Sequence, residues 1–180
     1  MKRDTLKAMA KNPFPHIFIA ALLPIGVFVG HFNRAHAESS VQHLKGTDPD
    51  SIDWRAKDVA WWRQVLTPDQ FKVCRLGETE RPFSGKYCHL KEHGKYTCSS
   101  CGQLLFRSDS KFDSGTGWPS FSTAVKEGVL TYHEDQSHGM TRTEVRCGRC
   151  DAHLGHVFKD GPPPSHTRFC INSVCLHHAP

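Results

Sequence analysis

The amino-acid sequence predicts a mainly β domain that begins with short helices and holds a structural zinc ion. Three observations lead to this prediction. The segment Thr67-Pro68-Asp69-Gln70 has the residues of a helix start. Beyond Gly77, Gly and Pro separate short apolar runs of strand length. Two Cys-x-x-Cys pairs, at 98–101 and 147–150, offer four thiolates to a tetrahedral metal ion.

The first 37 residues have the pattern of a secretory signal peptide. An apolar run from about residue 17 to 30 follows a basic start and precedes the small-x-small site Ala35-His36-Ala37. Pro24 interrupts this run, which is shorter than the ~20 residues that span a bilayer. We therefore expect cleavage after Ala37, export to the periplasm and no stable membrane insertion afterwards. An uncleaved N-terminal anchor is the alternative.

The positive charge of the chain belongs mostly to this leader. Of 23 basic and 18 acidic residues, five basic and one acidic lie in 1–37, which leaves 18 and 17 and a net charge of +1. So balanced a chain gives no reason to expect nucleic-acid binding. Residues 38–52 are a polar, flexible lead-in, and 53–180 are long enough for one domain with one core, expected as a monomer.

One or two short helices are expected at the start of this domain. Within residues 53–66, apolar side chains recur at near-helical spacing, at Trp54, Val59, Trp62 and Leu66. A second helix starts with Thr67 as its N-cap, has Pro68 in its first turn, closes a capping box with Gln70 and ends near Cys74. The tryptophans are interpreted as packing residues.

The later runs are expected to be strands of an antiparallel sheet. Each is short, partly alternating in polarity and bounded by turn residues; they lie at 95–97, 103–106, 129–132, 143–146 and 168–171. The last of them contains Cys170.

The cysteines of the two Cys-x-x-Cys pairs are assigned to zinc: Cys98, Cys101, Cys147 and Cys150. Each pair brings two sulfurs to a metal from one tight turn. The alternatives are two disulfides or a redox-active pair. A disulfide within Cys-x-x-Cys closes a very short loop and constrains the unfolded chain little, and the βαβ setting of thioredoxin-like motifs is missing. With four protein ligands the metal would stabilise the fold and take no part in catalysis.

Four cysteines remain: Cys74, Cys88, Cys170 and Cys175. Cys170 follows a segment with His153 and His156, and histidines near a thiolate lower its pKa and protonate a leaving oxygen. A buried thiol without a reaction is the alternative for Cys170.

Several motifs together resemble the B-type methionine sulfoxide reductases, which act on the R epimer. They are GETERPFSG at 77–85, KFDSGTGWPSF at 111–121, HLGHVF at 153–158 and RFCINS at 168–173, together with both Cys-x-x-Cys pairs. The similarity covers nearly all of 66–176. It implies two antiparallel sheets, with zinc opposite the active site.

The resemblance also implies roles for individual residues. Cys170 would attack the sulfoxide sulfur as a thiolate and end as a sulfenic acid, while the oxygen is protonated. His156 would be the principal proton donor, assisted by His153, and Trp118 would be an apolar wall for the substrate methyl group. Polar groups and water around the site would be held by Arg168, Asn172 and Asp160, although Asp160 before Gly161 also suits a turn.

One departure from the family concerns the recycling cysteine, whose common position holds Thr116 here. The resemblance points to Cys74 as an alternative position, which would form a disulfide with Cys170 for a thioredoxin-like protein to reduce. Direct reduction and recycling by Cys88 stay open. Cys175 is disfavoured, because five residues along one strand would place it on the opposite face from Cys170.

The expected function is therefore reduction of methionine-R-sulfoxide, mainly in oxidised proteins. A non-catalytic zinc-stabilised binding module and a general thiol–disulfide exchanger are the competing functions. The sequence does not distinguish free from protein-bound substrate.

Overall fold

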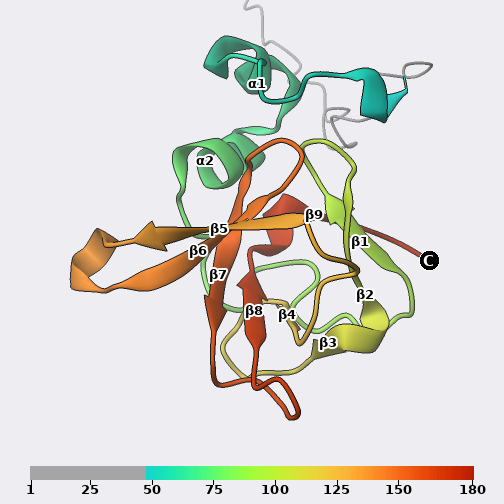
Figure 1. Cartoon of the computed structure of the whole chain (residues 1–180), viewed down its shortest axis with the longest axis vertical. Coiled ribbons are helices and arrows are strands. Elements are labelled where there is room, and N and C mark those ends of the chain that lie inside the picture. The colour runs from blue at the N-terminus through green and yellow to red at the C-terminus, as the bar shows by residue number, and fades with distance from the viewer. Residues whose placement is uncertain (1–47) are drawn as a thin grey trace, which may run out of the picture. The chain divides into compact units, whose positions relative to one another are not determined.

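The computed structural model describes residues 48–180; the predicted leader and residues 38–47 lie outside the described part. The short turn Pro49–Ser51 comes first, followed by helices α1 (Val59–Val65) and α2 (Pro68–Leu76). Nine strands follow (Figure 1). Within the described residues, no helix is long and apolar enough to cross a membrane.

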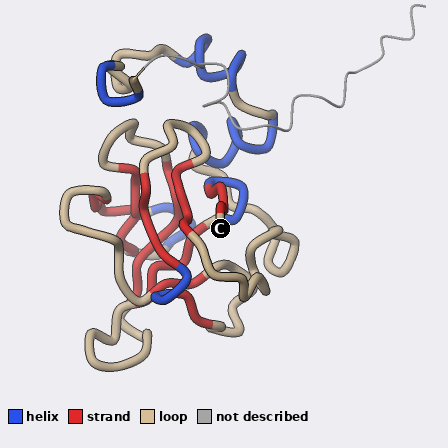
Figure 2. The backbone as a smooth tube through the Cα atoms, turned by 90° about the vertical axis from the view of Figure 1, so that its right-hand side faces the viewer, coloured by secondary structure: helices blue, strands red, loops and turns tan. Residues whose placement is uncertain are grey.

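The strands, drawn red in Figure 2, form two sheets, and every pairing is antiparallel, as predicted. The smaller sheet has the order β2 (Leu104–Arg107), β1 (Lys95–Cys98), β9 (Leu176–Ala179). The larger has the order β3 (Lys111–Phe112), β4 (Ser120–Phe121), β8 (Arg168–Ile171), β7 (His153–Phe158), β6 (Arg142–Cys147), β5 (Leu130–Asp135). Short 3-10 turns lie at Ser108–Ser110, Ser137–Gly139 and Ser173–Cys175.

Both predicted helices are present, and the capping box of α2 is confirmed. The Thr67 hydroxyl accepts from the Gln70 amide at 3.2 Å, and the Gln70 side chain accepts from the Thr67 amide at 3.1 Å. Thr67 thus satisfies a helix-end donor that would otherwise be unpaired. The helix runs to Leu76, two residues beyond the expected end, because Gly77 adopts the left-handed conformation that closes it (φ 74°).

Aromatic rings join the two sheets in the core. Phe106 of β2 stacks on Phe121 of β4 with ring centroids 4.3 Å apart, and Tyr96 of β1 meets Phe121 at 5.0 Å. All three are fully buried. Since each sheet supplies part of this packing, the sheets fix each other's position. The packing also supports β4, the neighbour of the strand that carries Cys170.

The tryptophans of the first helical segment pack as predicted. Trp54 and Trp62 are buried and their rings stack with centroids 6.1 Å apart, while Trp61 meets Trp62 edge-on at 4.8 Å. The guanidinium of Arg75 on α2 lies 3.4 Å from the centre of the Trp62 ring. The aromatic cluster and its cation therefore hold α1 against α2.

Two features differ from the sequence prediction. The histidine segment 153–158, which was given no secondary structure, is the strand β7 at the centre of the larger sheet. The strand with Cys170 ends at Ile171, and Cys175 lies in the 3-10 turn that follows. The alternation argument about Cys175 was therefore wrong, because period-2 alternation holds only within an extended strand.

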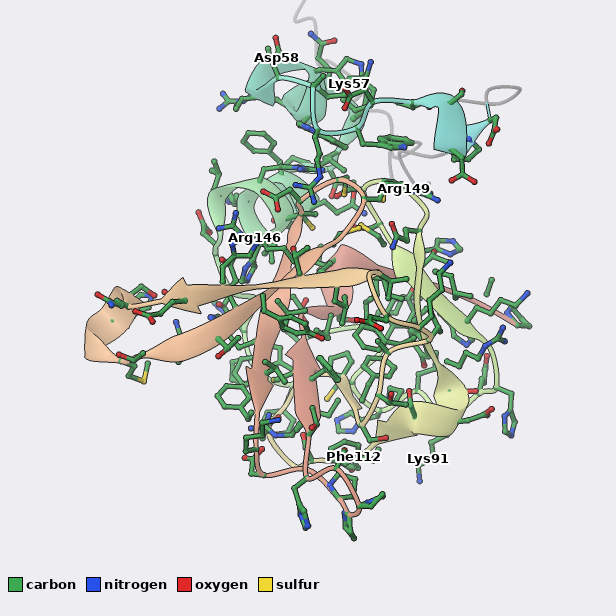
Figure 3. All side chains as sticks on the ribbon, in the orientation of Figure 1. Lys57, Asp58, Lys91, Phe112, Arg146 and Arg149 are labelled. Carbon is green, nitrogen blue, oxygen red and sulfur yellow. The ribbon has the colours of Figure 1, made fainter. Side chains whose placement is uncertain are left out.

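The hairpin formed by β5 and β6 extends beyond the rest of the larger sheet (Figure 1). Figure 3 shows Arg146 and Arg149, from the end of β6 and the turn after it, on the side of the molecule where the helices lie. Phe112 of β3 lies at the opposite end. The sheet therefore spans the domain, with β8 between its edges.

Candidate active site

Cys170 occupies an inner strand and has a directly opposed residue on each neighbouring strand. In the register of the larger sheet, Cys170 lies opposite His156 of β7 and opposite Ser120 of β4. Directly opposed residues of an antiparallel pair project to the same face, so the register itself brings His156 to Cys170. Cys170 is only partly buried.

The Cys170 side chain borders a pocket of about 110 Å³. Three of the predicted site residues line it with Cys170: Trp118, His156 and Asn172. Thr79, Arg142, Gly155 and Phe158 complete its wall. A space of this size admits the end of one side chain, and its mixture of rings and polar groups suits a small polar head on an apolar stem.

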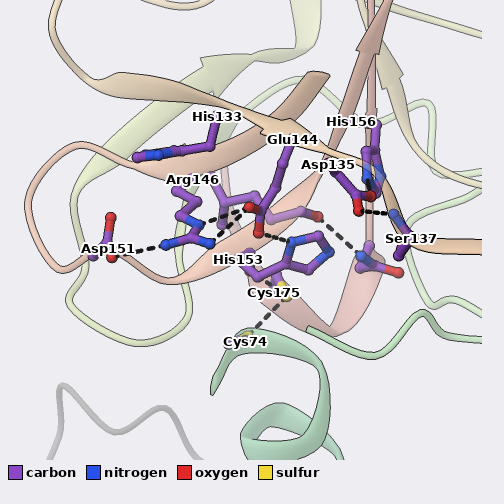
Figure 4. Close-up of polar contacts among 12 residues, drawn as sticks. Cys74, His133, Asp135, Ser137, Glu144, Arg146, Asp151, His153, His156 and Cys175 are labelled. Carbon is purple, nitrogen blue, oxygen red and sulfur yellow. Dashed lines mark hydrogen bonds and ion pairs between the residues drawn. The ribbon is translucent and has the colours of Figure 1, made fainter. Parts of the chain in front are cut away.

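His156 is held by an acidic partner that the sequence did not single out. Its Nε2 lies 2.7 Å from the Asp135 carboxylate (Figure 4). The same carboxylate also accepts from Arg142 at 2.7 Å. The Ser137 hydroxyl and amide, followed by His156, lower the pKa of Asp135, so this carboxylate stays ionised near neutral pH. The Asp135 carboxylate, held against Nε2, fixes the orientation of the His156 imidazole.

Arg168 and Asp160 form a bidentate ion pair beside Cys170. The two nitrogen–oxygen distances are 2.8 Å and 2.9 Å, and the guanidinium also lies over the Phe158 ring. Arg168 is buried, whereas Asp160 is exposed. Burial raises the pKa of the Cys170 thiol, and the Arg168 charge and the Thr116 hydroxyl partly oppose that effect. Asp160 therefore fixes the position of the Arg168 guanidinium.

Asn172 and Trp118 are tied to the loop that carries Glu80. The Asn172 amide accepts from the Glu80 backbone at 3.1 Å and donates to the Leu154 carbonyl at 3.1 Å. The Trp118 indole donates to the Glu80 carbonyl at 3.1 Å. The Glu80 carboxylate in turn accepts from the amides of Ser173 and Val174. This network sets the indole and the turn after β8 at fixed positions around the pocket.

Thr116 contacts Cys170, with Oγ1 4.0 Å from Sγ. Its hydroxyl also bonds to Ser114 at 2.8 Å, and Ser114 bonds to Ser120 at 2.7 Å. The position expected from the family for a recycling thiol therefore adjoins the reactive sulfur in this chain, but it carries a hydroxyl.

Four buried cysteines form a separate cluster that can hold a metal ion. The sulfurs of Cys98, Cys101, Cys147 and Cys150 all lie within 4.8 Å of one another, and two of the pairs are 3.8 Å and 3.6 Å apart. A tetrahedral ion with bonds of about 2.3 Å to sulfur places its ligands about 3.8 Å apart, so the donor set and spacing fit such an ion. The two turns follow β1 and β6, one from each sheet.

Comparison with known proteins identifies the family. A profile described as the SelR domain matches residues 66–180. The peptide methionine sulfoxide reductase MsrB of Pseudomonas fluorescens strain Pf0-1 is 58% identical over 124 residues, which are 69% of this chain and 95% of that protein. The MsrB of Pseudomonas syringae pv. syringae strain B728a is 55% identical over 129 residues, 72% of this chain and 98% of that protein. The chain belongs to the MsrB family.

The two histidines predicted for the active site of this MsrB family member line two different pockets. His153 does not line the Cys170 pocket; its Nδ1 lies 2.6 Å from Glu144, which forms a 2.8 Å ion pair with Arg146. Burial lowers the pKa of His153, although Glu144 opposes that shift. The ring centroids of His153 and His156 are 5.6 Å apart. Any effect of His153 on Cys170 therefore passes through His156.

Cys74 lies in the same region as His153. It borders a second pocket of about 410 Å³, whose wall includes His153, Glu144 and Arg146. Its Sγ is 2.8 Å from that of Cys175, and both residues are buried (Figure 4). The fold therefore places the predicted recycling thiol against Cys175 and outside the pocket of Cys170. Cys88, the other candidate, is buried beside Lys111, which donates to its carbonyl.

Sequence reasoning missed Asp135 and Arg142, and it saw Glu80 only as part of a motif. Asp135 and Arg142 are the directly opposed pair at the turn end of the β5–β6 hairpin. The sequence signal for them was weak, because isolated acidic and basic residues near a turn usually lie on a solvated surface.

Proposed function

We propose that this chain reduces methionine-R-sulfoxide, mainly within oxidised proteins, to methionine; its relatives carry the name peptide methionine sulfoxide reductase MsrB. The observation that carries the proposal is the pocket in which Trp118, His156 and Asn172 surround a partly exposed Cys170. Its small size suits one side-chain end and leaves the substrate backbone outside, which favours a methionine on a protein surface.

The first half of the reaction oxidises Cys170 by two electrons while it reduces the sulfoxide by two electrons. The Cys170 thiolate attacks the sulfoxide sulfur, and the oxygen accepts protons and leaves as water. A water molecule then adds to the Cys170 sulfur, so that the bond to the substrate breaks and methionine leaves. The sum is thiol plus sulfoxide giving sulfenic acid plus methionine, which consumes no external reductant.

His156 is the proposed proton donor in this step. Its place opposite Cys170 and its ion pair with Asp135 supply a proton beside the attacked group. His153 assists through its ring contact with His156. Trp118 provides an apolar wall for the methyl group of the substrate. The Arg168 charge favours the Cys170 thiolate, and Asp160 holds the Arg168 side chain in place.

The second half of the reaction returns Cys170 to its thiol. Cys74 attacks the sulfenic sulfur, which gives a Cys74–Cys170 disulfide and water, and a thioredoxin-like dithiol reduces that disulfide by exchange. Because Cys74 borders a different pocket from Cys170, this step requires α2 to move. Because position 116 carries threonine and no thiol, another cysteine such as Cys74 is needed to attack the sulfenic sulfur.

The metal of the four-cysteine cluster is proposed to be zinc. Four thiolates at tetrahedral spacing suit Zn²⁺, which supplies stability and no reactive position when all four ligands are protein sulfurs. The leader-like first 37 residues support export to the periplasm. We propose that the exported chain is a monomer. N-terminal sequencing of the exported protein tests this, and we expect it to begin at Glu38.

The activity itself is tested with dabsyl-methionine sulfoxide and dithiothreitol as reductant. We expect turnover of the R epimer, little of the S epimer, none with Cys170→Ser, and unchanged turnover with Cys88→Ser as the matched control. A lack of turnover would indicate a binding module. Equal turnover of both epimers, or reduction of insulin disulfides without reduction of the sulfoxide, would indicate a general thiol–disulfide exchanger.

A further inference from the structure

The Cys74–Cys175 pair is a chemical feature that the reaction described so far does not use. Cys74 Sγ lies 2.8 Å from Cys175 Sγ, within an ångström of the ~2.05 Å disulfide bond. Cys74 is on α2 and Cys175 is in the turn Ser173–Cys175, so the contact joins segments 101 residues apart. The two thiols are therefore already placed for bond formation.

This pair adjoins the active site without sharing its pocket. The chain from Cys175 back to Cys170 is five residues long, and the Cys175 thiol donates to the His153 carbonyl at 3.3 Å. On the other side, α2 leads through Gly77 into Thr79, which lines the Cys170 pocket. His153 and His156, in ring contact, mark the border between the two pockets.

We propose that Cys175 is a third redox cysteine, which takes over from Cys170 the disulfide formed with Cys74. This inference rests on the proposed function, because the oxidising equivalent comes from the Cys170 sulfenic acid. Cys175 needs no direct approach to Cys170 in this scheme, because it contacts Cys74.

The steps balance without an additional oxidant. Cys74 attacks the Cys170 sulfenic acid, which forms the Cys74–Cys170 bond and releases water. The Cys175 thiolate then attacks the Cys74 sulfur; a Cys74–Cys175 bond forms, the Cys74–Cys170 bond breaks, and Cys170 leaves as a thiolate that takes up the proton lost by Cys175. The reductant finally returns Cys74 and Cys175 to thiols.

This relay changes how much substrate the chain reduces before a reductant is needed. After the first methionine is released, Cys170 is free again while the disulfide is stored on Cys74 and Cys175. A second sulfoxide is then reduced and leaves Cys170 as a sulfenic acid. A chain with the relay therefore forms two methionines, whereas a chain that stops at Cys74–Cys170 forms one.

The experiment counts methionine in the absence of reductant. The full chain is reduced with dithiothreitol, freed of it under argon, and mixed with excess dabsyl-methionine-R-sulfoxide. After an acid quench, the product is quantified, free thiols are alkylated, sulfenic acid is trapped with dimedone, and disulfides are mapped by mass spectrometry. Cys175→Ser, Cys175→Ala and the control Cys88→Ser are run in parallel.

We expect two methionines per chain, a Cys74–Cys175 disulfide and dimedone on Cys170 for the unaltered chain and for Cys88→Ser. Both Cys175 variants should form one methionine and keep a Cys74–Cys170 disulfide, a twofold drop. One methionine with a Cys74–Cys170 disulfide in the unaltered chain overturns the relay but leaves the proposed function intact. No methionine at all overturns both. The unaltered chain decides the outcome by its map even if the variants fold poorly.

Discussion

Cys170 and Thr116 illustrate how much one side chain decides in this site. The hydroxyl of Thr116 lies 4.0 Å from the reactive sulfur, at the position where other members of the family are expected to carry a thiol. A hydroxyl there bonds to the thiolate but cannot form a disulfide with it. This one difference is why we propose that a more distant cysteine carries out the recycling step.

Restoring that thiol should bypass the distant cysteine. We expect Thr116→Cys to form a disulfide with Cys170 after one turnover and to restore dithiol-dependent recycling in a Cys74→Ser background. Peptide mapping after a single turnover measures this, with Ser122→Cys, outside the pocket, as the matched control. If the Thr116→Cys chain that retains Cys74 still formed a Cys74–Cys170 disulfide, the expectation that the new thiol reacts first would be contradicted.

The protonation of Cys170 gives a second prediction at the residue scale. Because burial raises its pKa, the thiolate fraction is small at neutral pH and grows as pH rises. Alkylation of Cys170 by iodoacetamide should therefore still be accelerating above pH 8.5, the ordinary value for a thiol. The rate is followed by mass spectrometry of the Cys170 peptide.

Arg168→Gln removes a positive charge that lowers the Cys170 pKa, so its alkylation at pH 8 should be slower by several-fold, with a similar limiting rate at high pH. The exposed Arg107 on β2 gives a matched control, Arg107→Gln, expected to leave the profile unchanged. A plateau below pH 8 in the unaltered chain would contradict the raised pKa.

At the scale of elements, α2 connects the redox pair, the metal cluster and the active-site loop. It carries Cys74, and its Arg75 donates to the carbonyl of Cys150 at 2.8 Å while stacking on Trp62. Its capping box fixes where the helix starts. The helix is short, so the cap satisfies a large part of its exposed backbone groups.

Loss of that cap should destabilise the domain measurably. Thr67→Ala removes the bond to the Gln70 amide and is expected to cost about 1 kcal/mol, or about 3–5 °C in Tm. Thr123→Ala in an exposed loop is the control, expected within ~0.5 kcal/mol of the unaltered chain. Thermal unfolding by circular dichroism measures both, and equal Tm values would show that the cap contributes little.

The β5–β6 hairpin is the second element with a double role. It forms the edge of the larger sheet and also supplies Asp135 and Arg142 to the surroundings of His156. Glu144, on the same hairpin, holds His153. Each histidine of β7 therefore contacts a different carboxylate of the neighbouring hairpin. Asp135 contacts His156 at the Cys170 pocket, and Glu144 contacts His153 near the Cys74–Cys175 pair.

At the scale of the whole domain, the four-cysteine cluster joins the two sheets. Cys98 ends β1 of the smaller sheet and Cys147 ends β6 of the larger, so a bound ion cross-links segments about 50 residues apart. Nearby, Arg55 donates to the Gly148 carbonyl at 2.8 Å, which attaches the first described segment to the same turn. The cluster thus stabilises the frame that supports the active site.

Removing the metal should therefore unfold the domain at a lower temperature. We expect one zinc per chain by elemental analysis, and for Cys147→Ser a loss of the metal and a fall in Tm of about 10 °C or more, because structural zinc contributes several kcal/mol. Cys88→Ser keeps all four ligands and should keep both the metal and the Tm. Full metal content in Cys147→Ser would contradict the assignment of that ligand.

Much of the fold was accessible from the sequence because it depends on local signals. The capping box needs only residues three apart, and the strands β1, β2, β5, β6 and β8 were found from short apolar runs between turns. The strand β7 was missed because it is buried and contains Gly155 and two histidines, which weaken the strand pattern. At Gly155 a Cβ would lie 2.0 Å from the Cys170 carbonyl, so the glycine serves close strand approach.

The sequence by itself determined the residue types: a cysteine within RFCINS, two histidines three apart, four cysteines in two tight turns, and threonine at position 116. Only the tertiary structure decided which of them meet. Strand register put His156, and not His153, opposite Cys170, and the packing of α2 on the turn after β8 put Cys74 against Cys175. The physical reason is that these contacts join residues far apart in the chain, and their distances are set by sheet pairing and core packing that no local pattern encodes.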